Sequence, residues 1–240
     1  MYMTDTETLS TRFQGLDASY FKRLTKLTPS FELLGTNSTH RQLAESCIRD
    51  RFEESYGANV QQFLSHLLTM HCPSGLSGVS GLSLAAQETL FLEQYLELPI
   101  EDELAKVLGR EVDRNSIVEV GNLVAITRGA SLALFIVLAS SLSRAGHKHM
   151  VFTATESLRS KFSKLGFKTT FINEADPDSL RPDAMDSWGN YYKSRPQVLV
   201  GSLDAAVQAI ADRNLFRCLQ KVFNNHIDGL VKDIEIMASR

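Results

Sequence analysis

The sequence predicts an α/β protein in which helices cover both faces of a mixed, twisted sheet. The main observation is a strand, a helix and a second strand that follow one another with short turns between them, at 117–126, 130–144 and 150–154. Strands joined by such a crossover run parallel and lie near one another. A hairpin pattern at 63–86, centred on Pro73 and Gly75, adds antiparallel strands and makes the sheet mixed.

Composition excludes several classes of protein. The 240 residues carry 25 basic and 28 acidic side chains, for a net charge of −3. A bulk electrostatic grip on nucleic acid is therefore not expected. The three cysteines, Cys47, Cys72 and Cys218, are odd in number and far apart, so neither a disulfide framework nor a metal site is indicated. They fit a reducing compartment.

Secretion and membrane insertion are not indicated. The N-terminal stretch lacks a basic segment followed by an apolar one, which a signal peptide would have. The longest apolar run, 130–142, is about 13 residues long, well short of the ~20 that span a bilayer. We expect a cytoplasmic protein without a transmembrane segment.

The chain divides into a polar lead-in (1–30), a domain (31–201) and a helical extension (202–240). In the domain, Thr39 and Gln42 form a capping-box pattern ahead of a helix over 40–56, which Gly57 closes. The remaining expected elements are an extended segment over 90–96, a helix over 99–108, a helix that Thr155 caps and Gly166 ends, strands at 168–172 and 197–201, and a helix over 202–223.

The last segment has apolar residues at helical spacing from Ile227 to Met237. This stripe predicts a helix that packs either within the molecule or against another subunit, so a homodimer is one expectation. Its charged residues are mainly acidic, unlike those of an interfacial membrane helix.

Glu119 is the residue that most needs an explanation, because it lies within the apolar strand IVEVGNLV. A carboxylate buried in such a strand is costly unless it is hydrogen-bonded or faces a cleft. The alternative is a side chain on the solvated face of an edge strand. Strict alternation would place Glu119 and Asn122 on opposite faces, whereas a bulge at Gly121 would bring them to the same face.

The turn after this strand suits an anion. Arg128 and Gly129 lead directly into the helix that begins at Ala130 and Ser131. Such a turn offers unpaired backbone N–H groups and the positive end of a helix dipole to a phosphate or a thioester oxygen. The dinucleotide and P-loop glycine patterns are both absent from the sequence, and an ordinary strand-to-helix turn is the alternative.

The order of these pieces resembles the acyl-binding core of the GNAT superfamily of acyltransferases. In that family the pantetheine of the donor lies between two splayed parallel strands, here 117–126 and 150–154, and its pyrophosphate lies on the intervening loop. The loop here is shorter than the family's usual one, as in acyl-homoserine-lactone synthases, and Phe162 stands where many members have a general-acid tyrosine. The resemblance implies a donor site made by Val120, Gly121, Arg128, Gly129, Ala130, Ser131, Thr153, Thr155 and Phe162.

A closer resemblance covers about residues 49–201. The strings RFEESYGANV, LFLEQYLELPIE, IVEVGNLV, VFTAT, LGF, WGNYY and PQVLVG, in that order, are similar to the thermostable hemolysin family of small bacterial proteins with a GNAT-like core. The family name implies lysis of red cells, while the core implies acyl transfer. A membrane-active toxin and an inactive GNAT-like binding module are therefore alternatives to an enzyme.

For the enzyme, we expect transfer of an acyl group, of long chain, from an acyl thioester to an amine or amino acid, without a permanently bound cofactor. Glu119 would act as general base or amine anchor, and Asn122 and the main chain beside it would polarise the thioester. The acceptor-site candidates are Glu93, Tyr95, Glu101, Trp188, Tyr191 and Tyr192, with surface charges and aromatic packing as the alternative readings.

The donor is acyl-CoA or an acyl carrier protein. A basic cluster surrounds one predicted helix and is made by Arg159, Lys161, Lys164 and Lys168. Such a cluster is an ordinary solvated face in many proteins, but it would also receive an acidic carrier protein.

Overall fold

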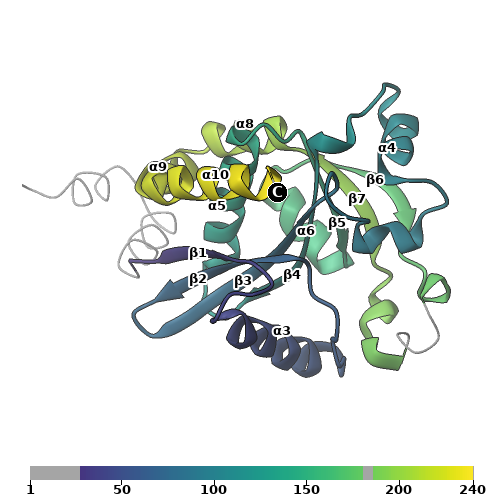
Figure 1. Cartoon of the computed structure of the whole chain (residues 1–240), viewed down its shortest axis with the longest axis horizontal. Coiled ribbons are helices and arrows are strands. Elements are labelled where there is room, and N and C mark those ends of the chain that lie inside the picture. The colour runs from purple at the N-terminus through teal and green to yellow at the C-terminus, as the bar shows by residue number, and fades with distance from the viewer. Residues whose placement is uncertain (1–27, 181–185, 240) are drawn as a thin grey trace, which may run out of the picture.

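The computed structural model describes residues 28–180 and 186–239, which form an α/β fold around a seven-stranded sheet (Figure 1). The strand order is β1-β2-β3-β4-β5-β7-β6, and every neighbouring pair is antiparallel except β4 and β5. The strands are β1 (Ser30–Leu34), β2 (His66–Cys72), β3 (Gly75–Leu84), β4 (Ile117–Ala125), β5 (His149–Ala154), β6 (Thr169–Glu174) and β7 (Gln197–Ser202). The predicted lead-in lies outside the described residues except for 28–30.

Helices cover both faces of the sheet, as the sequence predicts (Figure 1). One face packs against α3 (Arg41–Tyr56), and α4 (Ile100–Leu108) lies beside β6. The other face packs against α5 (Ala130–Arg144), which α8 (Leu203–Asp212), α9 (Asn214–Val222) and α10 (Asn224–Ala238) cover in turn. The short helix α6 (Glu156–Lys164) follows β5 and packs its apolar side chains against this second core.

The central helix α5 explains why the fold needs its C-terminal extension. Almost every residue from Ala130 to Leu142 is buried, since the sheet covers one side of the helix and α8–α10 cover the other. Burying a large aliphatic side chain contributes about 1.5–3 kcal/mol. The stripe from Ile227 to Met237 is buried within the same molecule, which decides between the two packing options.

Most expected elements are confirmed, and three details are wrong. The capping box before α3 does not form, because His40 is the N-cap and no side chain caps the helix. Residues 90–96 are not extended; they form the 3-10 helix η1 (Phe91–Tyr95), in which the Glu93 carboxylate accepts the Leu90 N–H at 2.6 Å. The helix expected over 202–223 breaks at Arg213, whose backbone is extended and whose guanidinium donates to the Lys164 carbonyl.

The parallel strands β4 and β5 pair over three residues only. Ile117, Val118 and Glu119 lie opposite His149, Met150 and Val151. Beyond Glu119, β4 continues alongside β3 and β5 continues alongside β7. The predicted arrangement of two parallel strands that separate after a short pairing is therefore confirmed.

Candidate active site

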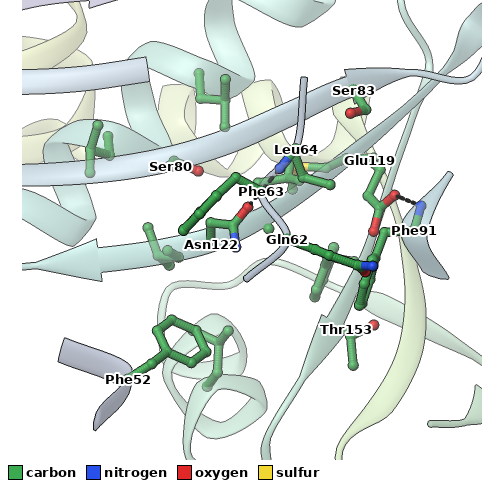
Figure 2. Close-up of a pocket in the computed structure, with 18 of the residues that line it drawn as sticks. Phe52, Gln62, Phe63, Leu64, Ser80, Ser83, Phe91, Glu119, Asn122 and Thr153 are labelled. Carbon is green, nitrogen blue, oxygen red and sulfur yellow. Dashed lines mark hydrogen bonds between the residues drawn. The ribbon is translucent and has the colours of Figure 1, made fainter. Parts of the chain in front are cut away.

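A β-bulge lies in β4 where it leaves β5. Val124 pairs with Val79 and Gly121 with Gly81, so two residues of β4, Asn122 and Leu123, face the single residue Ser80. Asn122 takes a left-handed conformation, with φ 47°. The bulge lies one residue after the predicted position at Gly121. It has the predicted effect, because Glu119 and Asn122 both face the side of the sheet that α3 and η1 cover (Figure 2).

Glu119 is buried and hydrogen-bonded, so the solvated-edge alternative is wrong. Its side chain is 3% exposed, and its carboxylate accepts the backbone N–H groups of Phe91 at 2.7 Å and Leu92 at 3.2 Å (Figure 2). Desolvation raises the pKa of Glu119 to about 8, against the opposing effect of these two hydrogen bonds. The negative charges of Glu88 and Glu93 raise it further. Glu119 therefore holds or releases a proton near neutral pH.

Asn122 fastens the segment between α3 and β2 to the sheet. Its Oδ1 atom accepts the Leu64 N–H at 3.0 Å (Figure 2). The carbonyls of Leu64 and Ser65 accept hydrogen bonds from the buried guanidinium of Arg41 at 2.8 and 2.7 Å, and Arg41 also donates to Glu45. This segment lines the site through Gln62, Phe63, Leu64 and Ser65, and no local motif in the sequence indicated it.

A cavity of about 930 Å³ occupies the opening between β4 and β5. Helices α3 and α5 lie on opposite faces of the sheet, and residues of both line the cavity, so the cavity crosses the sheet. Its half beside α5 and α6 is apolar. Its lining there includes Leu134, Phe135, Leu138, Phe152, Leu158 and Phe162.

The half beside α3 and η1 combines polar and aromatic side chains. Glu119 lines this half, together with Glu88 and Gln62. The Thr153 hydroxyl also lines the cavity and is buried without a hydrogen-bond partner. The aromatic side chains of this half form an aromatic wall, which consists of Phe52, Tyr56, Phe63, Phe91, Tyr95, Trp188 and Tyr191.

The WGNYY segment both packs and lines the cavity. Gly189 has φ 52°, and a Cβ atom there would collide with the carbonyls of Tyr56 and Gly57, so only glycine fits. The Asn190 N–H donates to the Tyr56 carbonyl at 2.7 Å, which fixes the segment to the end of α3. Trp188 and Tyr191 both line the cavity, with ring centroids 5.2 Å apart and ring planes tilted by 45°.

Tyr95 and Tyr192 form a hydrogen-bonded pair, with their hydroxyls 2.6 Å apart. Tyr95 lines the cavity. Tyr192 lies outside the lining and positions Tyr95 through this hydrogen bond. Burial raises the pKa of Tyr192 to about 12 and that of Tyr95 still further. Both phenols are therefore neutral at physiological pH.

Two expected acceptor residues, Glu93 and Glu101, are not in the cavity lining. Both pair with Arg114, which donates to the two oxygens of Glu93 at 2.8 and 2.9 Å. Burial opposes ionisation of Glu93, but Arg114 and the backbone N–H groups of Ile100 and Leu90 hold its pKa below the usual range. This ion-pair cluster supports η1, because Glu93 also accepts the Leu90 and Ile100 N–H groups.

The expected donor residues are divided between the lining and its surroundings. Val120, Gly121, Ser131, Thr153, Thr155 and Phe162 line the cavity. Arg128, Gly129 and Ala130 do not, although Gly129 caps α5 with φ 101° and Ser131 follows in the first turn. Thr155 caps α6 by accepting the Leu158 N–H at 3.4 Å, as predicted. The N-termini of two helices thus adjoin the cavity.

The basic residues expected as a cluster all lie on α6 or just after it. Lys161, Lys164 and Lys168 are exposed, and Arg159 is half-buried. Lys161 also belongs to the cavity lining, beside Leu158 and Phe162. The cluster therefore begins where the apolar half of the cavity meets the surface.

Residues 28–180 and 186–239 settle two further points, one about their helices and one about their metal-ligating side chains. Every helix there is too short or too polar to cross a bilayer. In the same ranges, no three His, Cys, Asp or Glu side chains are grouped in a way that could hold a metal ion.

Comparison with known proteins gives a family match and several distant structural similarities. The CoA-dependent acyl-homoserine lactone synthase MesI shares 14% identity at a TM-score of 0.47, over 76% of this chain and 94% of that one. The acyl-homoserine lactone synthase LasI shares 10% at 0.49, over 73% and 90%. FeeM, an N-acyl amino acid synthase from uncultured soil microbes, shares 13% at 0.48, over 72% and 88%. A search of curated proteins finds no match.

The family match covers most of the chain. The model of the thermostable hemolysin family matches residues 34–207, from the end of β1 into α8. This range contains the diverging strands, the bulge, Glu119 and the aromatic wall. The chain belongs to the thermostable hemolysin family.

Proposed function

We propose that the protein transfers an acyl group from an acyl thioester to an amine and so forms an amide. The observation that carries the proposal is the cavity that crosses the sheet between β4 and β5. Its apolar half meets its polar half beside a buried carboxyl group whose pKa is near 8. An acyl chain suits the first half and an amine suits the second, and Glu119, the last residue of β4 that pairs with β5, faces the second half.

The donor would lie along the opening. The apolar half would take the acyl chain, and the pantetheine would follow the β4 edge that β5 no longer pairs with. Backbone N–H groups near Val120–Asn122 would polarise the thioester carbonyl. Ser131, Thr155 and Arg128 lie at the N-termini of α5 and α6 or next to them, where helix dipoles favour the phosphates of CoA or of a carrier protein.

Glu119 would accept the proton that the acceptor must lose. An ammonium group cannot attack a carbonyl until it is deprotonated, and a carboxylate of pKa near 8 is a stronger base than an ordinary one. The neutral amine then attacks the thioester carbon, the C–S bond breaks and the thiol leaves with a proton. The net reaction converts a thioester and an ammonium ion to an amide, a thiol and a proton.

The acceptor would enter beside the aromatic wall. Trp188 and Tyr191 form part of this wall, and Tyr95 is held in place by Tyr192. Glu93 and Glu101 are left out of this role because Arg114 engages both carboxylates.

The donor is either acyl-CoA or a carrier protein. The exposed lysines that begin at Lys161 favour an acidic carrier protein, because the phosphopantetheine of a docked carrier would enter close to this residue. The family name suggests direct lysis of membranes instead. A fatty amide is a surfactant, so lysis through the product would agree with both the name and the cavity.

The test combines chemistry and leakage in one experiment. The purified chain is incubated with acyl-CoA or acyl carrier protein of several chain lengths and a mixture of amines. Products are identified by mass spectrometry, while dye release from liposomes is followed in parallel. Amides that depend on the protein would support the proposal. Leakage by the protein alone, without any amide, would overturn it in favour of the toxin.

A further inference from the structure

We infer that the acceptor is a cationic amine that carries no carboxylate, such as an alkylamine, an arylalkylamine or a diamine, rather than an amino acid. The inference rests on the proposed acyl transfer and names the substrate class of the same site. It comes from the way charges are divided between the two halves of the cavity. The experiment below separates its failure from failure of the acyl-transfer proposal.

The described lining of the acceptor half has acidic side chains but no free cation to pair with a substrate's carboxylate. Glu119 lines this half, and Glu88 is an exposed member of the same lining. Among the described lining residues, the cations are Arg41 and Lys161. A substrate carboxylate bound here would face acidic groups, and burial of an unpaired carboxylate is strongly unfavourable.

Neither cation is available to the acceptor. Arg41 donates to the Leu64 and Ser65 carbonyls and to Glu45 at 2.7–2.8 Å, so its guanidinium is engaged in holding the wall. Lys161 lies on α6, which packs against the α5 side of the sheet, whereas Glu119 faces the η1 side. The lysine therefore belongs with the anionic donor, and the acidic half is left for a cation.

The aromatic wall points to the same class of ligand independently of the charges. Phe52, Trp188 and Tyr191 pack with ring centroids 5.2–6.2 Å apart and line the acceptor half. Aromatic faces attract ammonium groups through their quadrupoles, most strongly when water is excluded. The same rings repel a carboxylate. In addition, the Thr153 hydroxyl is buried in this lining without a partner and could accept an ammonium N–H.

The test uses pairs of acceptors that differ only by a carboxylate. Cadaverine is compared with lysine, and tyramine with tyrosine, at a fixed donor concentration, with kcat/KM measured for each amide. We expect each decarboxylated amine to be preferred by about tenfold or more, because the carboxylate of the amino acid would be left without a cation to pair with. A preference for lysine and tyrosine would overturn the inference and leave acyl transfer intact. Absence of every amide would count against acyl transfer itself.

A charge-reversal variant sharpens the result. Glu88→Lys places a cation at the mouth of the acceptor half and should reduce the preference for cadaverine over lysine by about tenfold, mainly by improving lysine. The control is Glu97→Lys, an exposed glutamate outside the cavity lining, which should keep the original preference. If Glu88→Lys does not fold, Glu88→Gln should shift the preference in the same direction by a smaller factor. Equal shifts in the Glu88 and Glu97 variants would overturn the assignment.

Discussion

The carboxylate of Glu119 accepts the backbone N–H of Phe91 at 2.7 Å, and this contact joins β4 to η1 directly beside the cavity. The same carboxylate accepts the Leu92 N–H, so it also satisfies the first backbone donors of η1. The residue proposed to move the proton therefore also fixes the segment that carries Phe91 and Tyr95 into the aromatic wall.

Glu119→Gln should lower kcat/KM for amide formation by about 10²-fold or more, the usual contribution of a positioned general base. Binding of a non-reactive acyl-CoA analogue should stay within about twofold of the wild type, because the donor lies mainly on the other side of the sheet. Stopped assays by mass spectrometry and titration of the analogue measure the two effects. Full activity in this variant would assign the base to another group.

The stability of the wild type should fall relative to Glu119→Gln as pH rises from about 5 to 8. In this range the folded protein keeps a proton on Glu119 that the unfolded chain has released, because the pKa rises from 4.5 to about 8 on folding. The folded state then binds more protons, so the free energy of unfolding falls with pH, by at most about 1.4 kcal/mol per pH unit. Urea unfolding at several pH values tests this. Parallel curves for the two proteins would contradict it.

Phe162→Ala should shift the donor preference toward longer acyl chains. Phe162 lines the apolar half and packs on Phe135, Phe152 and Phe167 at centroid distances of 5.1–5.9 Å. Its removal lengthens the space for the chain and should destabilise the fold by about 2 kcal/mol, less than for a fully buried ring. Competition between acyl-CoA chain lengths measures the shift. The exposed Phe171, on β6 away from the cavity, provides the control Phe171→Ala.

Arg114→Met should destabilise the protein by about 2 kcal/mol, because Glu93 then loses its cation while it remains largely buried. The double variant Arg114→Met with Glu93→Gln should recover part of this loss. Thermal unfolding measures the single variants Arg114→Met and Glu93→Gln and the double variant. A loss in the double variant as large as the sum of the two single losses would show that the pair contributes nothing as a pair.

Lys164→Glu combined with Lys168→Glu should weaken activity with an acyl carrier protein by about tenfold and leave activity with acyl-CoA nearly unchanged. Both lysines are exposed, so the fold should tolerate the change. The expected loss should shrink at high ionic strength. Equal losses with both donors would show that the basic face does not receive a carrier protein.

Local sequence patterns predicted most helices and strands correctly. The contacts around Glu119 and Glu93 could not be predicted, because they join residues that are far apart in the sequence. The glycine after Tyr56 and the threonine at 155 cap helices as their sequence positions indicate. The 3-10 geometry of η1 was not predictable, because it depends on the contact of Phe91 with Glu119, 28 positions away. Glu93 and Glu101 looked available in the sequence, and only the fold brings Arg114 to them.

The position of the bulge and the composition of the aromatic wall also depend on contacts between residues that are far apart in the sequence. Gly121 indicated an irregularity in β4, but the ladder decides that Asn122 and Leu123 are the residues opposite Ser80. Trp188 and Tyr191 were predicted as acceptor-site residues. Phe52 and Tyr56 were not, because they lie in the helix expected over 40–56, where aromatic residues are typical of core packing. They become part of the site because Gly189 lets the distant segment approach the end of α3.

A cavity that reaches both faces of the sheet has a kinetic consequence for the proposed reaction. The two substrates would approach the point beside Glu119 from opposite sides, so neither would need to leave before the other arrives. Such an arrangement suits direct transfer within a ternary complex, in either order of addition, without an acyl-enzyme intermediate. The short pairing of β4 with β5, over three residues, is what leaves room for both routes.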